Sequence, residues 1–231
     1  MFHWASKEMS VWAVIPLKSP EAAKSRLSGV LNAPQRLRLF YALARRVIDA
    51  ATRTPGIAGV TVVTASEAVV AFAEKLGARC LRLDSDRGTA EACSRALESL
   101  PTHSVEGVLF VAGDLPLISP SALTPLAAFA EHRPLVAIAG DRRQFGTNAL
   151  LCAPGSAIPL CFGSGSFAKH LTAAAHAGVA AHIVDSAPLA LDIDEPADLH
   201  EWHRQLVASK QPIDVELHDL FAAQDDVALS Q

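Results

Sequence analysis

Short apolar runs alternate with amphipathic helical stretches along most of this chain, and this alternation constrains the fold more than any other feature. The run at 11–16 is apolar and rich in β-branched residues. A helical pattern follows at 34–51, where apolar side chains recur three and four residues apart. Alternation of this kind is typical of a mostly parallel sheet with helices on both faces, so the sequence predicts an α/β fold.

The rest of the chain continues the pattern. Further strands are predicted at 59–65, 79–83, 108–112, 135–139, 147–153, 179–184 and 189–193. Further helices are predicted at 67–76, 90–100, 119–131, 167–177 and 196–208. No repeat or linker divides the chain. We therefore expect one domain at 11–210, an N-terminal extension at 1–10 and a peripheral, acidic C-terminal segment at 211–231.

The composition excludes several classes of protein. The chain has 231 residues, of which 50% are hydrophobic, and a formal charge of −4, which does not favour nucleic-acid binding. Its four cysteines form no Cys-x-x-Cys pair, as expected of thiols in a reducing compartment. Residues 1–10 lack the apolar stretch of a secretory signal, and no apolar run approaches the length of a membrane span. We expect a soluble cytoplasmic protein that binds no membrane.

Two clusters of acids follow apolar runs. Asp114 comes just after the strand predicted at 108–112, and Asp192 and Asp194 end the run that begins at 188. Side chains alternate along an extended segment, so Asp192 and Asp194 should point the same way. Ligands bind at the carboxyl ends of strands in such sheets, and clustered acids repel unless a cation lies between them. We therefore predict a Mg²⁺ site at these three aspartates.

Helix capping is the alternative for the second cluster. Asp194 or Glu195 could cap the helix that begins at Pro196, because acids are common at helix starts. This alternative fits Asp114 less well, since Leu115 and Pro116 do not resemble a helix start.

The loop after the first strand carries three cations, Lys18, Lys24 and Arg26. It resembles neither a Walker loop nor a glycine-rich dinucleotide turn, so phosphates would be held by side chains more than by backbone amides. The other interpretation is a solvated basic loop.

Two small polar turns are candidate anion sites. The segment 162–167 is rich in glycine and serine and enters a predicted helix, whose free amides attract anions. A plain N-cap explains it equally well. The second turn is Gly146-Thr147-Asn148, and His170 follows the first turn closely enough to approach an anion.

Together these segments resemble the 2-phospho-L-lactate guanylyltransferase family of the CofC type, which includes phosphoenolpyruvate and 3-phospho-D-glycerate guanylyltransferases. This family is related to molybdenum cofactor guanylyltransferase and serves coenzyme F-420 biosynthesis. The matching stretches are Val14-Ile-Pro-Leu-Lys18, Ala23-Lys-Ser-Arg-Leu27, Gly113-Asp-Leu-Pro116, Gly146-Thr-Asn148, Phe162-Gly-Ser-Gly-Ser-Phe167 and Leu191-Asp-Ile-Asp-Glu-Pro196.

The resemblance implies a single Rossmann-like domain of the nucleotide-diphospho-sugar transferase type. It implies transfer of GMP from GTP to the phosphate of a three-carbon acid, with Mg²⁺ at Asp114, Asp192 and Asp194. The implied catalytic residues are Asp114, Lys24 and Arg26. The implied nucleotide-binding residues are Leu17, Lys18, Lys24, Arg26, Gly88 and Gly113. The implied acid-binding residues are Thr147, Asn148, Gly163 and Ser166.

Two departures from the family pattern concern specificity. The loop at 84–91 lacks the asparagine that is usual there, and this loop is expected to contact the base. Gln144 and Phe145 replace common glycines, so these two residues and Cys93 are candidates to shape the acid pocket. The sequence does not order 2-phospholactate, phosphoenolpyruvate and 3-phosphoglycerate. A downstream transferase of the same pathway is a candidate partner, and a homodimer is left open.

Three rival functions remain at this stage. One is a nucleotidyltransferase for molybdopterin or a sugar phosphate, although the usual Gly-x-Gly-x-Arg opening is absent. Another is a glycosyltransferase with an Asp-x-Asp motif, which here would be Asp192-Ile193-Asp194, unusually late in the chain. The third is a nucleotide-binding module without catalysis.

Overall fold

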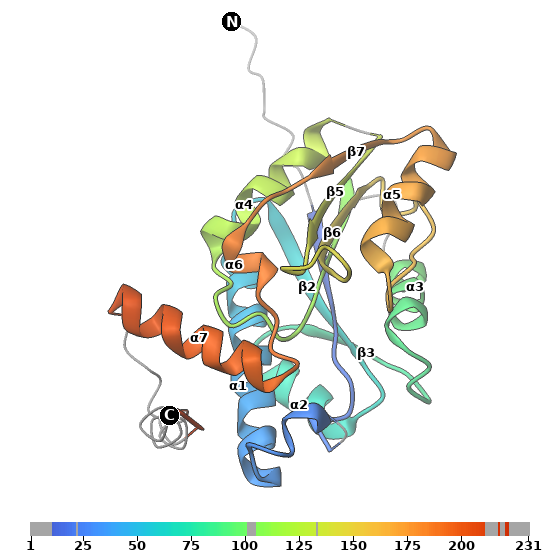
Figure 1. The fold of residues 1–231 in the computed structure, drawn as a ribbon. Coiled ribbons are helices and arrows are strands. Elements are labelled where there is room, and N and C mark those ends of the chain that lie inside the picture. The colour runs from blue at the N-terminus through green and yellow to red at the C-terminus, as the bar shows by residue number, and fades with distance from the viewer. Residues whose placement is uncertain are drawn as a thin grey trace, which may run out of the picture.

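The structure is a computed structural model that describes residues 11–21, 23–100, 105–132, 134–210, 217 and 220–221. The extension predicted at 1–10 lies outside these residues, as does most of the segment predicted at 211–231. Figure 1 shows one sheet at the centre of the molecule with helices packed around it.

The strands are β1 (Val11–Pro16), β2 (Ile57–Thr64), β3 (Arg79–Arg82), β4 (Gly107–Val111), β5 (Leu135–Gly140), β6 (Thr147–Ala153) and β7 (Ala180–Ile183). The helices are α1 (Ala33–Thr52), α2 (Glu67–Lys75), α3 (Thr89–Ser99), α4 (Pro120–Ala128), α5 (Ser166–Ala177), α6 (Ala187–Ala190) and α7 (Pro196–Ser209).

The strands form one sheet in the order β3-β2-β1-β4-β6-β5-β7. All neighbouring strands pair in parallel except β6, which runs antiparallel to both β4 and β5. The chain builds outward from β1 to β3 and then crosses back to place β4 on the other side of β1. The gap between the ends of β1 and β4 is therefore a topological switch point, where ligands bind in sheets of this kind.

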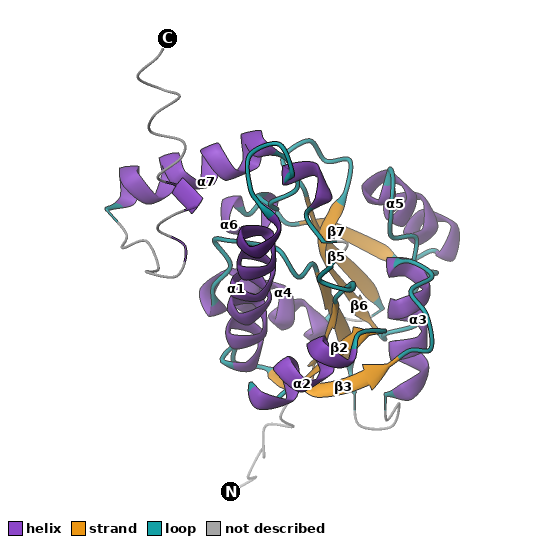
Figure 2. Ribbon diagram, turned by 90° about the horizontal axis from the view of Figure 1, so that it is seen from below, coloured by secondary structure: helices purple, strands orange, loops and turns teal. Residues whose placement is uncertain are grey.

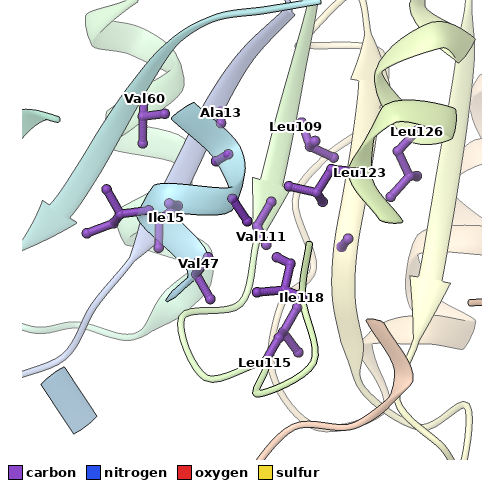
Figure 3. Packing of buried hydrophobic residues seen from close by; sticks show 14 of the residues in the cluster. Ala13, Ile15, Val47, Val60, Leu109, Val111, Leu115, Ile118, Leu123 and Leu126 are labelled. Carbon is purple, nitrogen blue, oxygen red and sulfur yellow. The ribbon is translucent and has the colours of Figure 1, made fainter. Parts of the chain in front are cut away.

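Helices cover both faces of the sheet, as the sequence predicts (Figure 2). On one face α1, α2 and α4 pack against the strands, and part of this cluster is shown in Figure 3, where Val47 and Leu123 approach Ile15, Leu109 and Val111. On the other face a second apolar cluster joins α3 and α5 to the sheet. The predicted α/β fold with a mostly parallel sheet is confirmed.

A third apolar cluster attaches α7 to the outside of α1. Trp202 of α7 is fully buried and lies in one cluster with Leu39 and Leu43 of α1. Its ring contacts that of Phe221 edge to face, with centroids 5.2 Å apart. This packing fixes the start of α7, and with it the acidic segment that leads into the helix.

Local sequence signals explain where the long helices begin and end. At the start of α1, the side chain of Asn32 accepts a hydrogen bond from the Gln35 amide, and the Gln35 side chain accepts one from the Asn32 amide. This is a capping box, and Pro34 in the first turn suits it. Helix α5 ends at Gly178, whose positive φ of 66° is a conformation that glycine adopts without strain.

One predicted strand is wrong. The segment predicted as a strand at 189–193 instead contains the end of α6 followed by an irregular stretch. Pro188 stands in the first turn of α6, where its fixed φ suits a helix, and Asn148 donates hydrogen bonds to the carbonyl groups of Leu189 and Ala190. These carbonyls therefore bond to a side chain and not to a neighbouring strand.

Candidate active site

A cavity of about 470 Å³ opens at the switch point between β1 and β4. It is lined by segments that follow β1, β2, β3 and β4, by the start of β6, by the turn before α5 and by the segment before α7. All residues predicted to hold the metal, the nucleotide or the phospho-acid line this cavity: Leu17, Lys18, Lys24, Arg26, Gly88, Gly113, Asp114, Thr147, Asn148, Gly163, Ser166, Asp192 and Asp194. The structure thus brings all three groups of predicted residues together.

The reversed direction of β6 explains how Thr147 and Asn148 reach the acidic end of the cavity. In a parallel strand these first residues would lie at the opposite edge of the sheet. Because β6 is antiparallel, its start lies beside the end of β4, and the Ala112 amide donates to the Asn148 carbonyl oxygen at 2.8 Å. Asn148 is thereby placed next to the segment that carries Asp114.

Lys24 lies between two of the predicted metal ligands. Its Nζ is 2.6 Å from Asp114 Oδ2 and 3.4 Å from Asp194 Oδ1, so these two oxygens are no farther apart than the sum of those distances. Only 7% of the Lys24 side chain is exposed. Burial alone would lower the pKa of Lys24, but the charges of Asp114 and Asp194 and their hydrogen bonds raise it overall. Lys24 is therefore a buried ammonium ion held by acids.

The backbone joins the same segments. The Ile193 amide donates to the Asp114 carbonyl oxygen at 3.2 Å, and the Lys24 ammonium donates to the Ile193 carbonyl oxygen. Ile193 is fully buried, whereas Asp192 and Asp194 on either side of it are partly exposed. The predicted alternation of these side chains is therefore correct, although the segment is not part of the sheet.

The environment of Asp192 disfavours its ionised form. Its pKa rises to about 6 because the carboxyl group is buried and lies near the charges of Asp114 and Asp194. A hydrogen bond from Asn148 Nδ2 to Asp192 Oδ1, 3.2 Å long, opposes this rise. The side-chain nitrogen of Asn148 thus donates hydrogen bonds both to Asp192 and to the carbonyl groups of α6. Asn148 also lines the cavity.

The capping alternative for Asp194 does not describe its side chain. The alternative holds for Glu195, which is the N-cap residue of α7 and forms a capping box with Asp198. The Oδ2 atom of Asp198 accepts hydrogen bonds from the amides of Asp194 and Glu195 at 3.0 and 2.8 Å. Asp198 also forms an ion pair with Arg142. The Asp194 carboxylate instead points toward Lys24 and lies 3.8 Å from Arg26 Nη1.

The donor chemistry of these aspartates suits a hard divalent cation, which prefers carboxylate oxygens. Asp114 and Asp194 share the ammonium of Lys24, and burial together with the charges of these two acids raises the pKa of the neighbouring Asp192. Among the described residues, however, no three acidic, histidine or cysteine side chains are already arranged as a ligand set. Lys24 Nζ lies between two of the candidates, so it would have to move for both to bind one ion.

The three basic side chains of the loop after β1 differ in exposure. Lys18 is exposed at the mouth of the cavity, and 68% of the Arg26 side chain is exposed. Lys24 adopts a left-handed conformation, with φ of 57°, just before a 3₁₀ turn whose Leu27 is fully buried. Anchoring by Leu27 directs Lys24 inward, whereas the side chains of Lys18 and Arg26 are exposed to solvent beside the cavity.

The glycine- and serine-rich turn offers fewer free amides than the sequence predicts. The Ser166 amide donates to the Gly163 carbonyl oxygen at 3.1 Å, and the Phe167 amide donates to that of Phe145 at 3.3 Å. Two amides at the start of α5 are thus used within the protein. The Ser166 and Thr147 side chains, by contrast, face each other beside the cavity, with their hydroxyl oxygens 3.0 Å apart.

Three residues expected to shape the acid pocket do not line the cavity. Cys93 is fully buried in the cluster beneath α3. Phe145 is 57% exposed, and Gln144 lies beside it in a turn that Asp141 closes by accepting from three amides. Among the described residues, none of the three lines the cavity.

Several cavity residues were not anticipated. Thr64 is the last residue of β2 and Ala65 follows it, and both line the cavity. Asp86 and Thr89 line it too, and they belong to the loop at 84–91 that is expected to contact the base. The rule that ligands bind at the carboxyl ends of parallel strands could have indicated them. Asp198 and His170 act behind the cavity through contacts distant in sequence, which no local motif signals.

Solved structures with this fold include nucleotide-transferring enzymes. A protein from Desulfovibrio desulfuricans G20, assigned as a nucleotide-diphospho-sugar transferase, superposes with a TM-score of 0.73 at 13% identity, covering 95% of this chain and 97% of its own. The 4-diphosphocytidyl-2C-methyl-D-erythritol synthase of Anaerococcus prevotii gives a TM-score of 0.58 at 12% identity, covering 87% and 97%. These likenesses define the class of fold.

The sequence relatives define the family. The family described as "Guanylyl transferase CofC like" matches residues 11–205, and the chain belongs to this family. It is 39% identical over 194 residues to the phosphoenolpyruvate guanylyltransferase of Rubrobacter xylanophilus, covering 83% of this chain and 92% of the relative. It is 35% identical to that of Conexibacter woesei, covering 88% and 91%. The family predicted from the motifs is confirmed.

None of the helices in the described parts of the chain combines the length and the apolar composition needed to cross a bilayer.

Proposed function

We propose that this protein transfers GMP from GTP to the phosphate of a three-carbon phospho-acid and releases pyrophosphate, as a step of coenzyme F-420 biosynthesis. Membership of the CofC-like family and relatives named phosphoenolpyruvate guanylyltransferase support this reaction. The observation that carries it is the cavity at the β1–β4 switch point, where basic, acidic and hydroxyl-bearing groups meet. Phosphoenolpyruvate is the first acid to test, because the relatives are named for it.

The reaction needs no general base. The second pKa of a phosphomonoester is near 6, so the acid's phosphate is already a dianion at neutral pH. One of its oxygens attacks the α-phosphorus of GTP and forms a new P–O bond. The bond from the α-phosphorus to the bridging oxygen breaks, and pyrophosphate leaves with the electron pair. The protein must therefore bring two anions together and stabilise the charge on the leaving group.

The chain's own residues fit these tasks. Lys18 and Arg26 are exposed cations at the mouth of the cavity, where they would contact the phosphates of GTP together with Lys24. Leu17, Gly88 and Gly113 line the same side and would contact the nucleotide, and Asp86 joins them near the base loop. Thr147, Asn148, Gly163 and Ser166 line the other side and would bind the phospho-acid.

Asp114, Asp192 and Asp194 would hold a magnesium ion. When bound, the ion would neutralise charge on the phosphates during transfer. The group of carboxylates beside Lys24 supports this assignment, because a divalent cation would offset the burial and the charges of Asp114 and Asp194 that raise the pKa of Asp192. Lys24 would then be released from Asp114 and Asp194 toward the phosphates of GTP.

The test incubates the purified protein with GTP, Mg²⁺ and one acid at a time, and measures pyrophosphate release. Phosphoenolpyruvate, 2-phospholactate and 3-phosphoglycerate are the three acids, and a sugar phosphate with CTP is the comparison. We expect release with at least one acid and a fall of at least about 100-fold in Asp114→Asn, which loses a charged ligand of the proposed magnesium ion. Asp185→Asn, at an exposed site away from the cavity, is the matched control.

Silence with all three acids would contradict the proposed reaction. Silence together with turnover of a sugar phosphate and CTP would instead identify a nucleotidyltransferase of the rival type. GTP binding without turnover of any substrate would indicate that the protein binds nucleotide but does not catalyse transfer.

A further inference from the structure

A histidine lies buried directly behind the wall of the cavity that carries Thr147. His170, on the first turns of α5, has no exposed surface. Its Nδ1 is 3.1 Å from Thr147 Oγ1, and the Cys161 amide nitrogen is 2.9 Å from its Nε2. The sequence suggested that His170 could approach an anion in the cavity. The structure shows that it does not reach the cavity but contacts Thr147, which does.

The partners of His170 determine which ring nitrogen carries the proton. A backbone amide can only donate, so Nε2 must accept from Cys161 and cannot carry a hydrogen. Burial lowers the pKa of His170 to about 4, so the ring is neutral at physiological pH. Its single N–H is then on Nδ1 and points at the hydroxyl oxygen of Thr147.

The hydroxyl of Thr147 receives a second hydrogen bond from Ser166, whose Oγ donates to it at 3.0 Å. A hydroxyl oxygen has two lone pairs, and these two donors use both. The Thr147 proton must then be donated outward. The described residues provide no acceptor for it, and Thr147 lines the cavity, so the remaining direction is toward a bound ligand.

We propose that His170 is a positioning residue that fixes the Thr147 hydroxyl as a hydrogen-bond donor to an anionic oxygen of the phospho-acid. Without the donor on Nδ1, the Thr147 hydroxyl could rotate and donate to the ring nitrogen or to Ser166 instead. This inference rests on the proposed function, because it assigns a role at the acid side of the same cavity. His170 would thus influence binding of the phospho-acid without contacting it.

Two substitutions separate this role from a structural one. In His170→Asn the amide nitrogen occupies the place of Nδ1, so a donor to Thr147 is kept while the Cys161 amide loses its acceptor. In His170→Gln the amide oxygen occupies the place of Nε2, so the Cys161 amide keeps its acceptor while Thr147 loses its donor. If His170 positions Thr147, His170→Gln should impair acid binding more than His170→Asn. If His170 only supports the Cys161 amide, His170→Asn should be the more damaging substitution.

The measurement is the KM for phosphoenolpyruvate and for GTP, from pyrophosphate release with saturating Mg²⁺. We expect His170→Gln to raise the KM for phosphoenolpyruvate by about tenfold, the effect of one lost hydrogen bond to a charged group, with little change in the KM for GTP. His170→Asn should raise it less. His176→Gln, the same substitution at an exposed site on α5, is the control and should leave both values unchanged.

A double-mutant cycle with Thr147→Val tests whether His170 acts through Thr147. If it does, adding His170→Gln to Thr147→Val should raise the KM for phosphoenolpyruvate little further, because the hydroxyl is already gone. Thermal melting of each variant shows whether it folds. If His170→Gln does not fold, His170→Asn decides alone, and a KM as high as that of Thr147→Val overturns the proposal.

The remaining outcomes are equally decisive. An unchanged KM for phosphoenolpyruvate in His170→Gln, a more severe effect in His170→Asn, or full additivity in the cycle would overturn the proposal while leaving the guanylyl transfer intact. A wild-type protein that releases no pyrophosphate with any of the three acids would overturn the proposed function and this inference with it.

Discussion

At the scale of single residues, ionisation of Asp192 opposes folding. Its pKa in the folded protein is about 6, compared with a usual value of 3.8, because of burial and the charges of Asp114 and Asp194. A carboxyl group whose pKa is raised on folding favours the folded state when it is protonated. That contribution is fully present below about 3.8 and is lost as the pH rises through about 6.

Asp192→Asn should therefore stabilise the metal-free protein at pH 8. The neutral amide avoids the cost of burying a charge and still accepts the hydrogen bond from Asn148 through its carbonyl oxygen. The expected gain in the free energy of unfolding is about 1–3 kcal/mol at pH 8 and shrinks toward zero near pH 4. Urea unfolding in the presence of a chelator at several pH values measures it.

Asp185→Asn is the control for that experiment, because Asp185 is exposed and does not line the cavity. A gain in Asp192→Asn that is the same at pH 4 and pH 8 would show that ionisation of Asp192 is not its cause.

The residue scale also shows what local patterns can and cannot reveal. The glycine, serine, lysine and aspartate motifs identified residues that do line one cavity, since these types mark strand ends and turns. The roles of His170 and Asp198 were not visible. Each depends on a partner brought near by the fold, Thr147 for His170 and Arg142 for Asp198, and sequence spacing does not encode such pairs.

At the scale of elements, the site depends on how α7 begins. Asp198 accepts from the amides of Asp194 and Glu195, so one carboxylate both caps α7 and fixes the backbone next to the Asp194 side chain. The ion pair with Arg142 joins this point to the turn before β6. The helix start and the acid side of the cavity are thereby coupled.

Asp198→Ala should for this reason affect both stability and turnover. Loss of the cap is expected to lower the free energy of unfolding by about 1–2 kcal/mol. Displacement of Asp194 should lower kcat by about tenfold, because small misplacements of a catalytic group are costly. Chemical unfolding and pyrophosphate release measure the two effects.

Glu201→Ala on the same helix provides the comparison. Glu201 bonds to Arg204 and Gln205 within α7, and the charge of Arg142 also acts on it. It does not bond to the amides of Asp194 and Glu195, so its loss should leave kcat unchanged and lower the free energy of unfolding by less than loss of the cap. If Asp198→Ala loses stability but keeps the wild-type kcat, the coupling between helix start and site is absent.

The one wrong element illustrates the limit of pattern reading at this scale. Leu189, Leu191 and Ile193 are all buried, as an inward-facing strand would require. Burial alone does not specify a strand, however, because the carbonyls of Leu189 and Ala190 bond to Asn148. Alternation predicted the directions of the Asp192 and Asp194 side chains correctly, while the backbone pairing depended on a residue more than forty positions away.

At the scale of the whole molecule, the site belongs to no single segment. Residues after β1, after β4 and before α7 meet around Lys24, and they can do so only because the sheet order places β4 beside β1. The sequence predicted the alternation and hence the sheet, but it did not specify the antiparallel direction of β6, which brings Thr147 to the same edge. Ligands that bridge these segments should therefore stabilise the entire fold.

Metal removal tests that expectation together with the assignment of the three aspartates. A chelator should abolish pyrophosphate release, and added Mg²⁺ should restore it, because the carboxylates then lack the cation that neutralises the phosphates. Mg²⁺ should also raise the melting temperature more at pH 8 than at pH 5. Asp192 must be ionised to bind the ion, and its pKa of about 6 leaves it largely protonated at the lower pH. Full turnover in chelator, or a stabilisation by Mg²⁺ that is equal at both pH values, would show that these aspartates hold no metal.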